Sequence, residues 1–326
     1  MRKLNHALLA GAFALACASC IAEKEANYQV IPLPQEVSLT QGNPFKLNEN
    51  VLIAYPENNA LLQRNAEFLS EYIQQATNYA PKTKAIAAGE QVKNAIVLGL
   101  DPGIANKEGY VLTTTPEGIS INGQTENGVF YGIQTLRKSI PAEAKGATIL
   151  IPAGEIKDEP RFSYRGMHLD VGRHFFPKEF IKKYIDLLAL HNMNTFHWHL
   201  TENQAWRLQS KVFPMLNDSV NTTRQPGKYY TLEEARELAA FCKQHHVLLI
   251  PEIDMPGHSA AFVRTFRHDM QSPEGMKILK LLIDEVCETF DVPYLHIGTD
   301  EVQFTNPDFV PEMVAYVRSK GKKVIS

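Results

Sequence analysis

The chain has 326 residues, of which 44% are hydrophobic and 21% are charged. This composition is ordinary for a globular protein with a sizeable core, and it argues against a disordered interaction protein. The formal net charge is −3, from 33 basic and 36 acidic residues, so the chain lacks the basic character typical of nucleic-acid binding. We therefore expect no nucleic-acid partner and no membrane-spanning segment.

Residues 1–20 have the pattern of an export signal. Arg2 and Lys3 precede an apolar run over 7–18 that is too short to cross a bilayer. Residues 16–18 offer a cleavage site of the A-x-A type, whereas Cys20 fits the lipid-attachment cysteine of a bacterial lipoprotein. The sequence thus predicts an exported protein, either secreted or held in the periplasm or at the outer membrane. A lipidated Cys20 is the only membrane attachment that we expect.

Residues 28–160 predict a small α+β domain. Apolar residues at helical spacing indicate helices around 62–76 and 129–140. Strands are predicted at 95–100 and 147–152, the second of which closes the domain, and a hairpin is predicted from 110–114 and 119–122. Because no catalytic cluster of residue types occurs here, we interpret this region as an accessory domain.

Residues 161–326 alternate strands with helices. Strands are predicted at 164–171, 194–200, 247–251, 294–299 and 323–325, and helices at 177–191, 231–246, 274–290 and 311–320. Pro177 is expected in the first turn of its helix, and Thr231 with Glu234 forms a capping box. Cys242 and Cys287 fall in helical patterns and are interpreted as core residues rather than a disulfide.

Repeated βα units predict a parallel sheet with helices on its faces. No glycine-rich phosphate loop follows a strand, so we favour a (β/α)8 barrel of the TIM type over a nucleotide-binding fold. A complete barrel takes about 250 residues, more than residues 161–326 provide. We therefore expect an incomplete barrel with an exposed edge at the fifth strand, and little activity from the chain as it stands, unless the sheet is completed in another way.

Polar side chains gather at the ends of four predicted strands. They are Asp170, Arg173 and His174, then His197, His199 and Glu202, then Glu252, Asp254 and His258, and finally Asp300 and Glu301. The carboxyl ends of barrel strands meet at one face, where such folds build their active sites. We therefore expect a functional site at this face.

Two kinds of chemistry fit the histidines at this face. His197 and His199 alternate on a strand, so both imidazoles point to one side. Together with His258, Glu252 and Asp254 they are candidate ligands of a metal-dependent barrel hydrolase. The alternative is that they bind carboxylates and make the site rigid. We favour this alternative and expect no metal.

The adjacent acids Asp300 and Glu301 favour carboxylate chemistry. Neighbouring acids in a partly dry cleft repel each other, and this repulsion raises the pKa of one of them. A raised carboxyl pKa is what a general acid requires at neutral pH. The pair therefore predicts acid–base catalysis.

Five motifs resemble a known family. They are Tyr164-Arg-Gly-Met-His-Leu-Asp170, Arg173-His-Phe-Phe-Pro177, Phe196-His-Trp-His-Leu-Thr-Glu-Asn-Gln-Ala-Trp-Arg207, Pro251-Glu-Ile-Asp-Met-Pro-Gly-His258 and His296-Ile-Gly-Thr-Asp-Glu301. They are similar to those of β-N-acetylhexosaminidases of glycoside hydrolase family 20, and residues 28–160 resemble that family's N-terminal domain. The resemblance implies exo-acting, retaining removal of terminal β-linked N-acetylglucosamine or N-acetylgalactosamine from a glycan or glycoconjugate, without metal or cofactor.

The resemblance also assigns roles by position. Glu301 matches the general acid/base, and Asp300 matches the carboxylate that orients the 2-acetamido group. Arg173 matches the residue that holds the sugar's hydroxyls. His258 matches the histidine that links the acid/base to a further carboxylate, and Glu202 stands where the family usually has Asp.

Two further residues complete the predicted site. Asp170 and His199, at the ends of the first two strands, are expected to bind substrate. Thr299 stands where the family usually has Gly, which affects fine geometry more than reaction type. A non-catalytic carbohydrate-binding relative and, less favoured, a metal-dependent hydrolase are the alternative functions.

Overall fold

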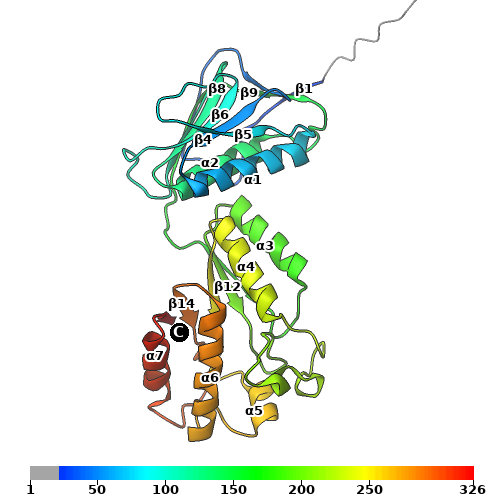
Figure 1. The fold of residues 1–326 in the computed structure, drawn as a ribbon, viewed down its shortest axis with the longest axis vertical. Coiled ribbons are helices and arrows are strands. Elements are labelled where there is room, and N and C mark those ends of the chain that lie inside the picture. Colours follow the sequence, from blue (N-terminus) through cyan, green and yellow to red (C-terminus); the bar gives the residue numbers. More distant parts are fainter. Residues whose placement is uncertain (1–21) are drawn as a thin grey trace, which may run out of the picture.

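The computed structural model describes residues 22–326, and the export signal predicted at residues 1–20 lies outside them. An N-terminal α+β part packs on a second part built around a parallel sheet (Figure 1). Among the residues described, none of the helices has the length and apolar character needed to cross a membrane.

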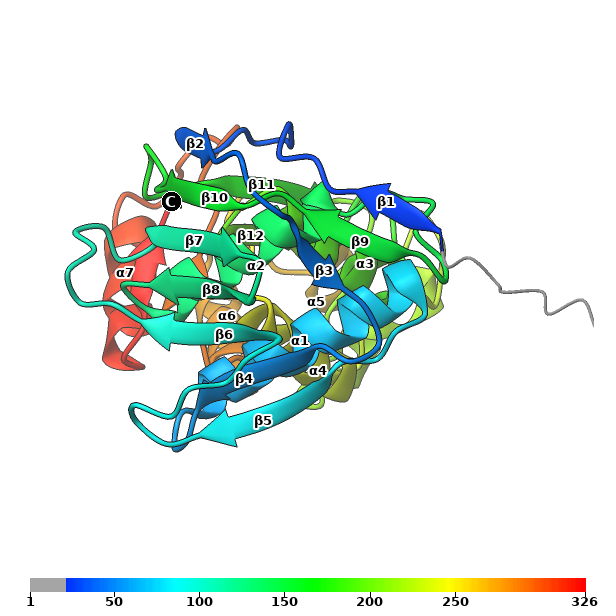
Figure 2. The same ribbon diagram turned by 90° about the horizontal axis from the view of Figure 1, so that it is seen from above.

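The N-terminal part consists of two sheets and two helices. Seven strands follow the order β2-β10-β7-β8-β6-β4-β5, and a smaller sheet has the order β1-β9-β3. The strands are β1 (Glu23–Glu25), β2 (Glu36–Leu39), β3 (Phe45–Leu47), β4 (Leu52–Pro56), β5 (Lys82–Ile86), β6 (Ala95–Leu100), β7 (Tyr110–Thr115), β8 (Gly118–Gly123), β9 (Thr148–Ile151) and β10 (Gly154–Asp158). Helices α1 (Ala60–Thr77) and α2 (Glu126–Ser139) contact each other and lie between the large sheet and the second part (Figures 1 and 2).

Both predicted helices and the predicted hairpin of this part are confirmed. Helix α1 begins where the Asn59 side chain accepts a hydrogen bond from the Leu62 N–H at 2.9 Å. The strand at 147–152 does not close the domain, however, because β10 follows it and pairs with β2 and β7. Glu155 and Lys157 alternate along β10 on its less buried side, so this strand has no continuous apolar run by which it could be predicted.

The second part is a five-stranded parallel sheet in the order β11-β12-β13-β14-β15, with β11 and β15 at its edges. Its elements are β11 (Gly166–Asp170), α3 (Lys178–Leu190), β12 (Thr195–His199), α4 (Leu232–Gln244), β13 (Leu248–Glu252), α5 (Ala260–Phe266), α6 (Pro273–Thr289), β14 (Tyr294–His296), α7 (Phe309–Ser319) and β15 (Lys323–Ile325). Two short 3-10 turns, Pro214–Asn217 and Ser219–Asn221, lie in the loop after β12. The predicted βα alternation is confirmed.

Local sequence signals account for most of these boundaries. The capping box of Thr231 and Glu234 is present at the start of α4. Pro177 is the residue before α3 rather than its first helical residue. Strand β14 ends at His296, three residues earlier than predicted, because Gly298 and Thr299 have φ values of +67° and +90° that turn the chain. The unpredicted α5 has only seven residues.

Strand β12 directs apolar side chains into the core and histidines to the opposite face of the sheet. Phe196 and Trp198 are fully buried, and the Phe196 ring lies 5.5 Å from that of Tyr184 on α3. His197 and His199 alternate with them and therefore point to the other face. Cys242 and Cys287 are free thiols, as predicted, and Cys242 is buried in the core.

The two parts are joined by polar contacts between helices. Arg137 on α2 donates to both carboxylate oxygens of Asp186 on α3, at 2.8 and 2.9 Å. The ring nitrogens of His246, after α4, each lie 2.8 Å from an amide oxygen, one of Asn65 on α1 and the other of Asn127 on α2. These contacts place the N-terminal part against the helices of the second part.

A buried arginine ties together the loops after β11 and β12. Arg207 is fully buried, and its guanidinium donates to five backbone carbonyls, those of Val171, Gly172, Arg224, Gln225 and Lys228, at 2.8–3.2 Å. Burial lowers the pKa of Arg207 to about 10, so the group stays charged at neutral pH. Removal of the guanidinium would leave several carbonyls without a donor.

We predict that Arg207→Met lowers the free energy of unfolding by at least about 3 kcal/mol, because buried acceptors lose charge-assisted hydrogen bonds. Urea titration followed by circular dichroism measures the change. Arg236→Met, an exposed position on α4, is the matched control and should alter stability by less than about 0.5 kcal/mol. Equal stability of the two variants would show that the five hydrogen bonds contribute little.

Candidate active site

A pocket of about 330 Å³ opens at the carboxyl ends of β11 to β14. Its lining residues are His168, Arg173, His197, His199, Glu252, Asp254, His258, His296, Gly298, Thr299, Asp300 and Ser326. Residues 22–160 contribute none of them. The concentration of titratable groups at this end of the sheet agrees with the position predicted from the strand ends.

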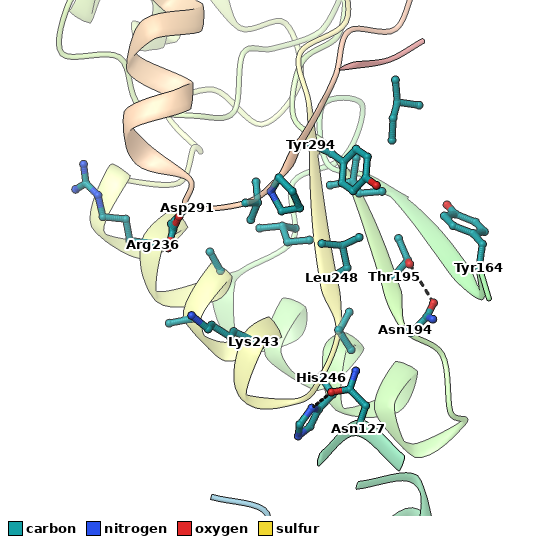
Figure 3. Close-up of a pocket in the computed structure, with 18 of the residues that line it drawn as sticks. Asn127, Tyr164, Asn194, Thr195, Arg236, Lys243, His246, Leu248, Asp291 and Tyr294 are labelled. Carbon is teal, nitrogen blue, oxygen red and sulfur yellow. Dashed lines mark hydrogen bonds between the residues drawn. The ribbon is translucent and has the colours of Figure 1, made fainter. Parts of the chain in front are cut away.

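A larger cavity of about 1090 Å³ lies at the opposite end of the sheet. Figure 3 shows Thr195, Leu248 and Tyr294 from the starts of three strands, with Asn127 of the N-terminal part beside His246. In barrel folds this end supports stability, whereas catalysis occurs at the carboxyl ends of the strands. The smaller pocket is therefore the candidate active site.

Glu252, at the end of β13, is buried among imidazoles from both neighbouring strands. Its Oε2 lies 2.6 Å from Nε2 of His197 and 2.8 Å from Nδ1 of His199, and its Oε1 lies 3.5 Å from Nδ1 of His296. Burial by itself would raise the pKa of Glu252, but the three imidazoles outweigh it and hold the pKa far below its usual range. The parallel register places His199, Glu252 and His296 side by side.

Within residues 22–326, three groups of side chains bring possible metal-ligating atoms within 4.8 Å of one another. They are His168, His199 and Glu252; His197, Glu252 and His296; and Asp254, His258 and Asp300. Two ligand atoms on a tetrahedral zinc ion are roughly 3.3 Å apart, given ligand distances of about 2.0–2.1 Å. The contacts of 2.6 and 2.8 Å at Glu252 are shorter than this. The first two groups therefore fit direct pairing of imidazole with carboxylate better than a shared ion.

The structure joins five of the predicted site residues in a continuous set of contacts. Nη1 of Arg173 lies 2.8 Å from Oδ2 of Asp170, and Nη2 of Arg173 contacts Oε1 of Glu202. Oε1 of Glu202 also lies 2.7 Å from Nδ1 of His258. On the other side of the imidazole, Nε2 of His258 lies 3.3 Å from Oε2 of Glu301. The histidine thus stands between two carboxylates, as the resemblance implies.

The Glu202 side chain is completely buried, and the loop after β11 leaves room for it. A Cβ at Gly172 would lie 2.7 Å from Cβ of Glu202, so a larger residue there would push the two loops apart. The absence of a side chain at Gly172 therefore lets the two loops approach closely at Glu202.

Backbone strain collects around the acidic pair. His258, Thr299 and Glu301 have φ values of +47°, +90° and +49°, a region that non-glycine residues seldom occupy. The cost is greatest for the β-branched Thr299, and such strain is typical of functional sites. Asp300 lines the pocket, whereas the Glu301 side chain is 76% exposed.

Asp254 is the pocket residue whose importance was least evident from sequence. It is 1% exposed, and neither carboxylate oxygen has a hydrogen-bond partner among the described residues. Burial, followed by the charges of Glu252 and Asp300, raises the pKa of Asp254 to about 6. Asp254 comes two residues after Glu252, so both side chains point to the same side of extended backbone. From the sequence, this spacing predicted only that Asp254 could be a metal ligand.

Comparison with known families identifies the chain. The model of "Glycosyl hydrolase family 20, catalytic domain" matches residues 162–272, and that of "Glycosyl hydrolase family 20, domain 2" matches residues 27–159. The chain belongs to glycosyl hydrolase family 20. The resemblance seen in its motifs is thereby confirmed.

Named relatives support this family assignment. A β-hexosaminidase of Porphyromonas gingivalis is 35% identical over 86% of this chain and 40% of the relative, and one of Vibrio furnissii is 34% identical over 64% and 39%. The solved family 20 β-N-acetylhexosaminidase of Streptomyces coelicolor A3(2) superposes with a TM-score of 0.80 at 28% identity, over 90% of this chain and 65% of that one. The chain spans about 40% of the length of these two curated relatives. The predicted fold class, a TIM-type barrel preceded by an α+β domain, is confirmed for family 20 by the solved structures.

We predict that Asp254→Asn stabilises the protein at pH 7.5 by up to about 2–3 kcal/mol, and that the gain disappears below about pH 4. The folded-state pKa of Asp254 is raised to about 6, against about 3.9 for an unfolded aspartate. At pH values between these two pKa values, the folded state binds more protons than the unfolded state does. The stability of the unsubstituted protein therefore falls as pH rises through this range. Urea unfolding across pH 4–8 measures the difference.

The matched control for this prediction is Asp291→Asn, which removes an exposed carboxylate at the opposite end of the sheet. Its effect on stability should be small and nearly independent of pH. A gain for Asp254→Asn that does not change with pH would contradict a raised pKa.

Proposed function

We propose that the whole protein is an exo-acting, retaining glycoside hydrolase that removes terminal β-linked N-acetylhexosamine by substrate-assisted catalysis. The observation that carries this proposal is the set of contacts from Arg173 through Glu202 and His258 to Glu301, with Asp300 next to it. It contains a residue suited to each step of that reaction. One general acid/base is sufficient because the substrate supplies its own nucleophile.

In the proposed first step, the carbonyl oxygen of the substrate's 2-acetamido group attacks the anomeric carbon. Glu301 donates its proton to the leaving oxygen, so the glycosidic bond breaks as an oxazolinium intermediate forms. Glu301 then takes a proton from water, which attacks the anomeric carbon and reopens the ring. His258, between Glu202 and Glu301, is placed to orient the acid/base carboxylate through both changes of protonation.

Two other residues are assigned to the sugar. Asp300 accepts the amide N–H of the acetamido group, which aligns the nucleophile and offsets the positive charge that develops. Arg173, held by Asp170 and Glu202, donates to the sugar's hydroxyls. A relative from Streptomyces plicatus, 29% identical with a TM-score of 0.79 over 90% of this chain and 64% of that one, was solved as a mutant in complex with the product GlcNAc, which supports an N-acetylhexosamine substrate.

We further propose that the protein acts outside the cytoplasm on glycans or glycoconjugates that end in N-acetylglucosamine or N-acetylgalactosamine. The support is the sequence of residues 1–20, with its basic start, apolar run and Cys20. Labelling with a palmitate analogue tests the anchor: incorporation that is lost in Cys20→Ser supports a lipoprotein, whereas an unlabelled secreted form would contradict lipidation.

We predict that the whole protein hydrolyses aryl β-N-acetylglucosaminides without a divalent cation. The reaction needs only carboxyl groups of the protein and the substrate's amide, and Glu252 contacts imidazoles directly. Activity should be unchanged after dialysis against EDTA. Loss of activity on chelation, with recovery on addition of zinc, would instead favour a metal-dependent hydrolase.

We predict that Glu301→Gln and Asp300→Asn differ in their dependence on the leaving group. Glu301→Gln should reduce kcat/KM by about 10²–10⁴-fold for poor leaving groups and much less for activated ones, which need little acid assistance. Asp300→Asn should reduce it for both kinds, because the nucleophile itself is misaligned. A series of aryl substrates measures this, and parallel losses in both variants would contradict the division of roles.

A further inference from the structure

Asp254 lies in the wall of the pocket beside Asp300. Its backbone N–H donates to Oγ1 of Thr201 at 3.0 Å, which fixes the start of the loop after β13. Asp254, His258 and Asp300 bring side-chain oxygen or nitrogen atoms within 4.8 Å of one another. On the remaining side, a Cβ at Gly298 would overlap Oδ1 of Asp254, so the carboxyl group occupies space that glycine leaves free.

The surroundings of Asp254 disfavour a negative charge. The group is almost fully buried, and none of the described residues donates a hydrogen bond to it. Glu252 at the end of β13 and Asp300 after β14 both disfavour ionisation of Asp254, and His199 on β12 and His258 after β13 oppose them only in part. A buried carboxylate without donors and next to two acids is stabilised when it takes up a proton.

We propose that Asp254 is a positioning residue that carries a proton at mildly acidic pH and donates it as a hydrogen bond to the carboxylate of Asp300. Asp300 then keeps its second oxygen free to accept the substrate's amide N–H. The proton stays on Asp254, between the two carboxyl groups. This inference rests on the proposed function only for the role of Asp300; the protonation of Asp254 is independent of it.

The arrangement has a consequence for pH dependence. When Asp254 loses its proton, two carboxylates face each other across the pocket wall, and the exposed Asp300 is the one free to move. Asp300 would turn away, and the acetamido group would lose its alignment. Misplacement of a reacting group by about 1 Å can cost 10²-fold in rate. Activity should therefore fall as pH rises past the pKa of Asp254, even for substrates that need no acid assistance.

The protonation can be measured on this chain without any assay of activity. Carboxyl ¹³C resonances of aspartate, followed by NMR between pH 3 and 8, should include one that titrates near pH 6 and is missing in Asp254→Asn. Asp291→Asn should leave that resonance unchanged. If the resonance removed by Asp254→Asn titrates near the ordinary aspartate value of about 3.9, the proposal is overturned.

The positioning role is tested by the pH profile of the whole protein on an activated aryl β-N-acetylglucosaminide. Asp254→Asn is permanently neutral and keeps a donor toward Asp300, so kcat should remain within about threefold at pH 5 and stay high at alkaline pH. Asp254→Ala should reduce kcat about 100-fold with little change in KM. Equal loss in both variants, or an unchanged pH profile in Asp254→Asn, would show that Asp254 serves only the structure.

These two measurements also separate this inference from the proposed function. If the unsubstituted protein does not cleave the aryl substrate, the proposed hydrolase fails. The NMR titration then still decides whether Asp254 carries the proton. A titration near pH 6 would support the protonation of Asp254, and a titration near the ordinary aspartate pKa of about 3.9 would overturn it.

Discussion

The contact between Glu252 and the imidazoles of its neighbouring strands is the interaction on which the site depends. A carboxylate buried at a strand end is costly unless donors reach it, and His197, His199 and His296 approach it from β12 and β14. These contacts keep Glu252 ionised and hold three strands in register at the level of the pocket. Its negative charge in turn acts on the next acid along the chain, Asp254.

A second shared carboxylate connects two functions within the pocket. Oε1 of Glu202 contacts both Arg173 and His258, so the group expected to grip the sugar and the group that orients the acid/base depend on one oxygen. Burial of Glu202 makes either contact costly to break, because the other partner alone cannot compensate a charge removed from water. One buried carboxylate oxygen therefore holds both Arg173 and His258 in place.

The two ends of the parallel sheet have different physical characters. At the carboxyl ends, buried and half-buried charged groups face one another around the small pocket. At the amino ends, the larger cavity is lined by residues such as Leu248, Leu249 and Ile250, next to the N-terminal part. Arg137 and Asp186, together with His246 and its two asparagine partners, fix that end against α1, α2 and α3. The N-terminal part thus supports the sheet from the side away from the chemistry.

The sequence by itself determined the elements and the end of the sheet where polar groups collect. Helical spacing, the capping box at Thr231 and the apolar β6 are local signals, and local backbone physics is enough to interpret them. The strand-end positions of Asp170, His199, Glu252 and Asp300 follow from the direction of parallel strands. Local signals failed at β10, which is half-buried and polar on alternate positions, and at β14, where Gly298 and Thr299 end the strand early.

Only the tertiary structure decided how these side chains are paired. Whether the histidines bind a metal or a carboxylate depends on the 2.6 Å between His197 and Glu252, a distance across two strands that no spacing along the chain contains. The same holds for Glu202, which meets Arg173 and His258 from different loops, and for Asp254, whose raised pKa arises from burial and from charges on other elements. Burial and electrostatic coupling depend on distance in space, and only folding sets that distance for residues far apart in the chain.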